Sequence, residues 1–174
     1  MPSGDIGFVV LLVIHIASVI AWMGSSILFV LVIGPALPKL NQQSRAEFLI
    51  EVLPKLARFI QLASTSTIIA GIVLLGYVGS LDTNLLPSGL GLLLLLSGAV
   101  LGFAAFIVGA TVLLPSSRKV LHILANMRES KEQGAASSLS DESTKLQDAI
   151  RGGSKAVAVL LAIVLILMVS GTYL

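Results

Sequence analysis

Apolar residues of this chain come in four long blocks separated by more polar segments. The blocks cover residues 6–33, 56–78, 90–114 and 156–174. Each is close to or longer than the roughly 20 residues that an α-helix needs to cross the hydrocarbon core of a bilayer. A water-soluble core does not need apolar runs of this length. The pattern therefore predicts an all-α integral membrane protein, a four-helix bundle that forms a single transmembrane domain over residues 1–174.

Residues 115–155 form the longest connection, and its composition divides it in two. The first part has apolar residues at helical spacing, at Val120, Leu121, Leu124 and Met127. This spacing predicts that the third helix continues past Pro115 or restarts there. A flexible stretch at 134–138 is expected next, followed by a short amphipathic helix on the membrane surface that starts near Ser140 and ends at Gly152-Gly153. An ordinary connector that covers the end of the bundle accounts for the same pattern.

The basic residues predict the orientation of the chain. All 11 Lys and Arg residues lie at 39–58 and at 118–155, and the two ends of the chain and the 79–89 turn contain none. Because Lys and Arg are retained in short cytoplasmic loops, both termini should face outward, with both long connections in the cytoplasm. The chain is then a multi-pass protein of a cell membrane, with the lipid bilayer as its main partner. Topology accounts for the basic residues, so no nucleic-acid partner is predicted.

Composition supports the membrane assignment and narrows the chemistry. Apolar residues make up 56% of the chain and charged residues 11%, and the mean hydropathy is +1.01. The absence of cysteine excludes disulfides, thiolate metal sites, iron–sulfur clusters and thiol catalysis. A secretory signal peptide is the alternative for residues 6–33, but Asp5 and the lack of a basic residue before that block argue against it.

His15 is the one strongly polar, titratable side chain well inside a predicted span. An imidazole in hydrocarbon needs a hydrogen bond or a metal, which makes it a candidate for function. Helical spacing places it on one face with Ser18, Trp22, Ser25 and Phe29. Such a face should point into the bundle. Two interpretations stay open: His15 is a metal ligand, or it donates a packing hydrogen bond to a neighbouring helix.

Other polar or small residues near the spans have two interpretations each. Arg58 either extends to the lipid headgroups or holds an anionic group such as a porphyrin propionate. His122 lies roughly 10 Å beyond Pro115 if the helix continues, so it is expected in solvent and not beside His15. A ridge of small residues in the third span allows either a tight helix pair or room for a flat cofactor; it contains Gly98, Gly102, Ala105 and Gly109.

The first span carries a recognisable pattern. His15 is followed by Trp22-Met-Gly24, then by Phe29, and the span ends at Gly34-Pro35. This resembles the opening helix of the copper resistance protein D superfamily, which also contains the HemJ-type protoporphyrinogen oxidases. About 30 residues carry the resemblance. It implies a small bundle in which the histidine of the first helix ligates b-type haem or takes part in copper handling.

Carried over to this chain, the resemblance makes His15 the metal ligand and Trp22 part of its packing context. Spans 90–114 and 156–174 contain no Lys, Arg or His, unlike the later spans of the HemJ-type oxidases. The leading hypothesis is therefore a protein that binds haem b through His15, with Trp22 and Arg58 as further cofactor-binding residues and electron transfer as its role. No catalytic residue is assigned. The second axial ligand would come from a partner or from a second copy in a homodimer.

Two alternatives belong to other functional classes. The first is a non-catalytic structural or assembly subunit of a larger membrane complex, which would use the small-residue faces of its helices for docking. The second is copper transport, which the sequence supports poorly. Soft ligands are sparse, since there is no cysteine and only four methionines.

Overall fold

Nearly all of the chain is helical. The computed structural model describes residues 5–81, 87, 89–129 and 136–173. Four of its helical stretches are long and apolar enough to cross a membrane, and they cover Ile6–Lys39, Gln43–Ser80, Leu90–Ile123 and Asp148–Tyr173. The four predicted spans are thereby confirmed as long apolar helices. Each helix extends beyond its apolar block.

The first long helix consists of α1 (Ile6–Leu28), a π-helical turn (Phe29–Ile33), α2 (Gly34–Ala36) and a 3₁₀ turn (Leu37–Lys39). The carboxylate of Asp5 caps its start by accepting the N–H of Gly7 at 2.9 Å. The π-helical turn comes directly before Pro35, and in it the N–H of Gly34 bonds the carbonyl of Phe29. A proline lacks the N–H and crowds the preceding turn, and a widened turn relieves that crowding.

The second long helix, α3 (Gln42–Leu81), begins well before the predicted span and passes through Pro54 without a break. Asn41 starts it, because its side-chain oxygen accepts the N–H of Ser44 at 2.8 Å. Leu49 and Leu53 are buried on one face of its first part. Burial of that apolar face stabilises the part of the helix that precedes Pro54. The proline itself removes only one backbone hydrogen bond.

The third long helix contains α4 (Leu90–Val108), a second π-helical turn (Gly109–Leu113) and α5 (Leu114–Glu129). It starts at Gly89, which has a φ of 59° that a glycine adopts without strain. The helix continues past Pro115, as one of the two predictions for this segment stated. The π-helical turn again lies shortly before the proline. In both helices, a widened turn therefore relieves the crowding that the proline ring causes.

The fourth long helix, α6 (Ala136–Tyr173), passes straight through Gly152-Gly153. The predicted separate surface helix that ends at those glycines is therefore wrong. A Cβ at Gly153 would lie 2.7 Å from Leu113 Cδ2, so this glycine allows α6 to approach the third helix and does not end the helix. Of the predicted flexible stretch at 134–138, residues 136–138 are helical and 134–135 lie outside the described residues. Most of the 79–89 turn lies outside them too.

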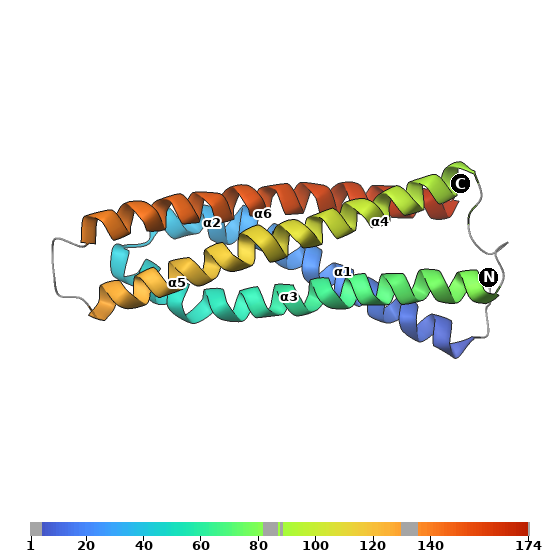
Figure 1. Cartoon of the computed structure of the whole chain (residues 1–174), viewed down its shortest axis with the longest axis horizontal. Coiled ribbons are helices and arrows are strands. Elements are labelled where there is room, and N and C mark those ends of the chain that lie inside the picture. Colours follow the sequence, from blue (N-terminus) through green and yellow to red (C-terminus); the bar gives the residue numbers. More distant parts are fainter. Residues whose placement is uncertain (1–4, 82–86, 88, 130–135, 174) are drawn as a thin grey trace.

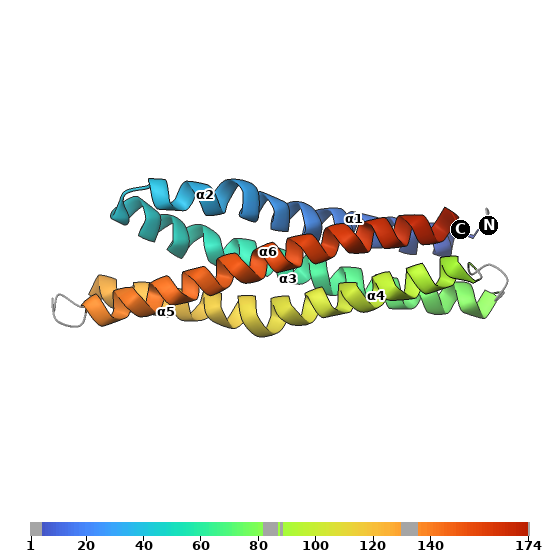
Figure 2. The same ribbon diagram turned by 90° about the horizontal axis from the view of Figure 1, so that it is seen from above.

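The long helices pack side by side in two close pairs. α1 packs along α3, and α4 packs along α6. The N- and C-terminal ends of the described chain lie at one end of the molecule, and α2, α5 and the start of α6 lie at the other (Figure 1; Figure 2). All four long helices contribute to a central core of Trp22, Ala63, Ala105, Val157 and Leu161. The outer surface carries large exposed apolar side chains on every long helix, a surface suited to lipid.

Candidate functional site

His15 lies half-buried between α1 and α3. Its Nδ1 is 3.0 Å from the backbone carbonyl oxygen of Thr67. A carbonyl oxygen only accepts, so Nδ1 carries the hydrogen and donates it. In the neutral imidazole, the lone pair is then on Nε2. The hydrogen bond fixes both the tautomer and the direction of the ring.

Gly71, one helical turn beyond Thr67 in α3, makes room for the imidazole. A Cβ at Gly71 would lie 2.9 Å from His15 Cε1, which is closer than real Cβ contacts allow, and 3.3 Å from Nδ1. The ring therefore rests directly against the α3 backbone. Thr67 and Gly71 together form a seat for His15. The sequence contained both residues, but nothing in it indicated that they face His15.

Apart from His15, the polar side chains of the predicted face of α1 pack in the core or bond to the backbone of α1 itself. Trp22 is only 3% exposed and packs in the central core. Three serine hydroxyls donate to carbonyls four residues earlier, from Ser18, Ser25 and Ser26. Each of these hydroxyls therefore makes its hydrogen bond to a backbone carbonyl of α1. Trp22 is thus a packing residue in this structure.

The structure does not bring Arg58 and His122 to His15. Arg58 is exposed on α3, nine residues before Thr67, and so stands roughly 13 Å away from it along the helix axis. His122 is exposed on α5, beyond Pro115. Of the three predicted cofactor-binding residues, His15 lies in the α1–α3 interface, Trp22 in the core and Arg58 on the surface.

The small-residue ridge of the third helix forms a tight helix pair. A Cβ at Gly98 would lie 3.0 Å from Met168 Cγ, and one at Gly102 would lie 3.8 Å from Val164 Cγ1. Near the end that carries the termini, a Cβ at Gly171 would lie 2.9 Å from the carbonyl oxygen of Gly91. Helix α6 therefore fills the space beside Gly98 and Gly102, whereas a Cβ at Gly109 would meet nothing within 4 Å. This supports the helix-pair interpretation over the flat-cofactor interpretation.

Two cavities lie between the level of Trp22 and the end of the molecule opposite the termini. One, of about 70 Å³, is lined by residues of all four long helices, among them Trp22 and Phe29 and Gly109 of the two π-helical turns. The other, of about 120 Å³, is lined by Arg45, Arg151 and other residues of that end. Sites for drug-sized ligands occupy about 300–1,000 Å³. Neither cavity has the volume for a porphyrin, and His15 lines neither.

A second contact joins α1 and α3 at the end that carries the termini. The hydroxyl of Tyr77 donates to Asp5 Oδ2 at 2.6 Å. This hydrogen bond, with a smaller contribution from the N–H of Gly7, lowers the pKa of the exposed Asp5 carboxyl below its ordinary value of 3.8. The two partners are 72 residues apart, so the sequence pattern did not indicate that they meet.

Within the described ranges, no group of three or more His, Cys, Asp or Glu side chains could hold a metal ion. Comparisons of the chain with protein-family models, with curated proteins and with solved structures gave no match. The assignment of function therefore depends on the geometry of His15 and on the distribution of charge.

Proposed function

We propose that this chain is a multi-pass membrane protein in which Nε2 of His15 would hold b-type haem, with electron transfer as its role. The supporting observation is the 3.0 Å hydrogen bond from Nδ1 to the Thr67 carbonyl. A histidine that ligates a metal through one nitrogen characteristically donates its other N–H to such an acceptor. The chemistry that the haem would supply is one-electron transfer by its iron.

The residues of one chain would supply one nitrogen ligand to the haem and do not enclose a macrocycle. His15 offers a nitrogen of the right tautomer, but the two cavities described above are too small, and α6 fills the space beside Gly98 and Gly102. We place the haem at an interface between two copies of the chain, with one His15 from each copy. The exposed apolar side chains that flank His15 on α1, Ile14 and Ile16, suit a dry interface. The expected ratio is one haem for two chains.

We also propose an orientation with both termini outside and the basic connections in the cytoplasm of a cell membrane. Support comes from the arrangement of the ends of the molecule (Figure 1). Helix α5, with Arg118 and Lys119, stands at the end opposite the termini, as do Arg45 and Arg151. A positive charge excess at one end of a set of membrane-crossing helices marks the cytoplasmic side.

A non-catalytic subunit of a membrane complex is the second candidate. The observation that favours it is the Gly71 contact, because a ring pressed against the α3 backbone joins α1 to α3 without any ligand. In this case His15 contributes one interhelical hydrogen bond. For copper transport, the described residues offer no group of three or more His, Cys, Asp or Glu side chains as support.

The test is a visible absorption spectrum of the purified protein, oxidised and reduced, with haem and protein quantified on the same sample. The proposal expects about one haem for two chains, lost in His15→Ala and kept in His122→Ala. The second variant is the matched control, since it removes the other histidine of the chain from an exposed position on α5. Haem content that is unchanged in His15→Ala, or absent from folded wild-type protein grown with ample haem, would favour the subunit.

A further inference from the structure

The cavity of about 120 Å³ at the end opposite the termini has one basic side and one apolar side. Its cationic residues are Arg45 of α3 and Arg151 and Lys155 of α6. Among the lining residues that the structure describes, these three cations face one carboxylate, that of Asp148. The apolar wall of the cavity comes from the first long helix, α3, α5 and α6, and includes Phe29, Leu37, Leu49, Leu53 and Val120.

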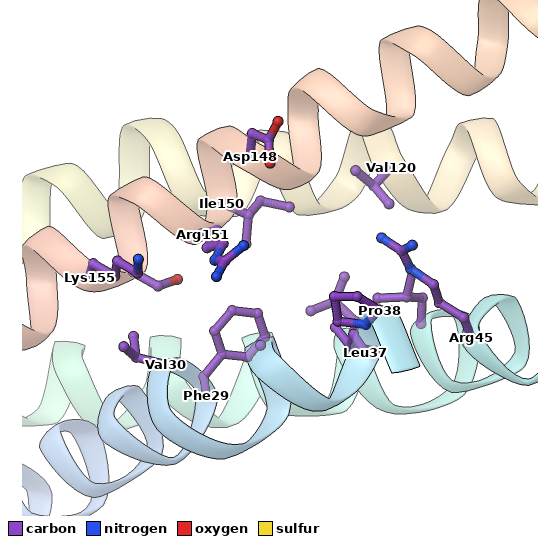
Figure 3. A pocket seen from close by; sticks show the side chains of 14 residues that line it. Phe29, Val30, Leu37, Pro38, Arg45, Val120, Asp148, Ile150, Arg151 and Lys155 are labelled. Atoms are coloured by element: carbon purple, nitrogen blue, oxygen red, sulfur yellow. The ribbon is translucent and has the colours of Figure 1, made fainter. Parts of the chain in front are cut away.

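The charged groups are arranged around one space. Figure 3 shows the guanidinium groups of Arg45 and Arg151 reaching from two different helices toward the gap between α6 and the first long helix. In the same view, Asp148 is drawn above Ile150 and Arg151 on α6, and it too lines the cavity. Two guanidinium groups directed into one cavity are suited to a phosphate, whose oxygens accept paired N–H donors from arginine.

The depth of the cavity matches the headgroup layer of a bilayer. Lys155 stands immediately before the apolar block 156–174, and Leu37 and Pro38 follow shortly after the block 6–33. Lys155 therefore lies where an apolar span ends, the two arginines lie further toward the polar end of the molecule, and Phe29 and Val30 lie on the side of the spans. A phospholipid has the same order, with a phosphate at the boundary and acyl chains beyond it.

We infer that this cavity binds the phosphate of an anionic phospholipid headgroup, with the acyl chains lying against the apolar wall. Basic pockets between membrane helices on the cytoplasmic side recognise anionic lipids in this way. The two arginines hold the phosphate oxygens, and Lys155 adds charge that favours an anionic headgroup over a zwitterionic one. This inference does not depend on haem binding.

The test uses the full chain in detergent, titrated with phosphatidylglycerol or phosphatidylcholine, with bound lipid counted by native mass spectrometry. The expected result is binding of phosphatidylglycerol that weakens about tenfold or more in the double variant Arg45→Gln/Arg151→Gln. The matched control is Arg118→Gln/Lys119→Gln, which removes two exposed cations of α5 at the same end but outside the cavity. That control should bind phosphatidylglycerol like the wild type.

Three results would overturn the inference. Equal weakening in both double variants would mean general attraction between a basic surface and an anionic lipid. Equal binding of the two lipids by the wild type would mean that the headgroup charge is not recognised. Displacement of phosphatidylglycerol by inorganic phosphate at equal concentration would make the cavity a site for free anions.

A second variant covers the case in which the double variant fails to fold. Lys155 is exposed, so Lys155→Gln should leave the helix packing intact. This substitution should weaken the binding of phosphatidylglycerol, as the double arginine variant does, but by a smaller factor. Unchanged affinity in both Lys155→Gln and a folded arginine variant would contradict the inference.

Discussion

Nδ1 of His15 donates to the carbonyl oxygen of Thr67 across the α1–α3 interface. Ten residues before His15 and ten residues after Thr67, Tyr77 donates to Asp5 in the same antiparallel register. These two contacts join the apolar helix α1 to α3. In a membrane, helices gain little from burying apolar surface against one another, so such polar contacts and close packing determine which faces meet.

Gly71→Ala tests the seat of His15. The added Cβ would lie 2.9 Å from His15 Cε1, so the ring or the helix must shift. We expect a loss of about 1–3 kcal/mol in the free energy of unfolding, the usual cost of overpacking. In haem-loaded protein, the shift should also lower the haem content, because the direction of Nε2 changes. Unfolding in detergent and the absorption spectrum measure the two effects.

The matched control is Gly76→Ala in the same helix, where a Cβ meets nothing within 4 Å. Both variants gain the helix propensity of alanine, about 1 kcal/mol, so their difference isolates the contact with His15. Equal stability of the two variants would contradict the packing described for the imidazole.

Tyr77→Phe tests the pairing of α1 and α3 through its dependence on pH. The Tyr77 hydroxyl is the main cause of the lowered pKa of Asp5. A lowered folded-state pKa stabilises the fold above the ordinary value of 3.8, and the contribution is lost as the pH falls through the folded value. Wild type should therefore be more stable than Tyr77→Phe near neutral pH, and the difference should close in strongly acidic buffer. A difference that does not vary with pH would assign the loss to packing alone.

The sequence predicted the four apolar helices because a helix that crosses the hydrocarbon core needs a minimum number of apolar residues. An apolar run such as 90–114 has that length. The sequence did not predict where the helices end. Pro35 was interpreted as the end of the first span, yet the chain passes Pro35, Pro54 and Pro115 in helical form, twice by way of a π-helical turn. A proline costs one hydrogen bond, and packing of residues such as Leu49 and Leu53 outweighs that loss.

For the candidate site, the sequence identified His15 because an imidazole within an apolar run is rare. It could not identify Thr67, which acts through its backbone carbonyl, or Gly71, which acts by lacking a side chain. The basic cavity was missed for a different reason. Arg45 and Arg151 are far apart in the sequence, and the positive-inside rule had already explained both.

Gly171→Ala tests the close approach of α6 to the third helix. The new Cβ would meet the carbonyl oxygen of Gly91 at 2.9 Å and the amide nitrogen of Leu95 at 3.0 Å. Backbone atoms cannot rotate away, so the helices must separate, at a cost of about 1–3 kcal/mol of stability. Gly152→Ala, in the same helix with open space around it, should instead be neutral or stabilising by up to about 1 kcal/mol. Thermal unfolding in detergent compares the two, and a similar melting temperature for both would contradict the contact.

Single cysteines test the orientation, because the chain has no cysteine of its own to react. Thr172→Cys places a thiol at the exposed end of α6 beside the termini, and Lys119→Cys places one on exposed α5 at the opposite end. Added to intact cells, a maleimide that cannot cross membranes should label Thr172→Cys and leave Lys119→Cys unlabelled until the cells are opened. The reverse pattern would put the basic connections outside, and it would place the cavity of Arg45 and Arg151 in the outer leaflet. Because that cavity needs an anionic lipid on its own side, the labelling pattern also decides which leaflet can supply it.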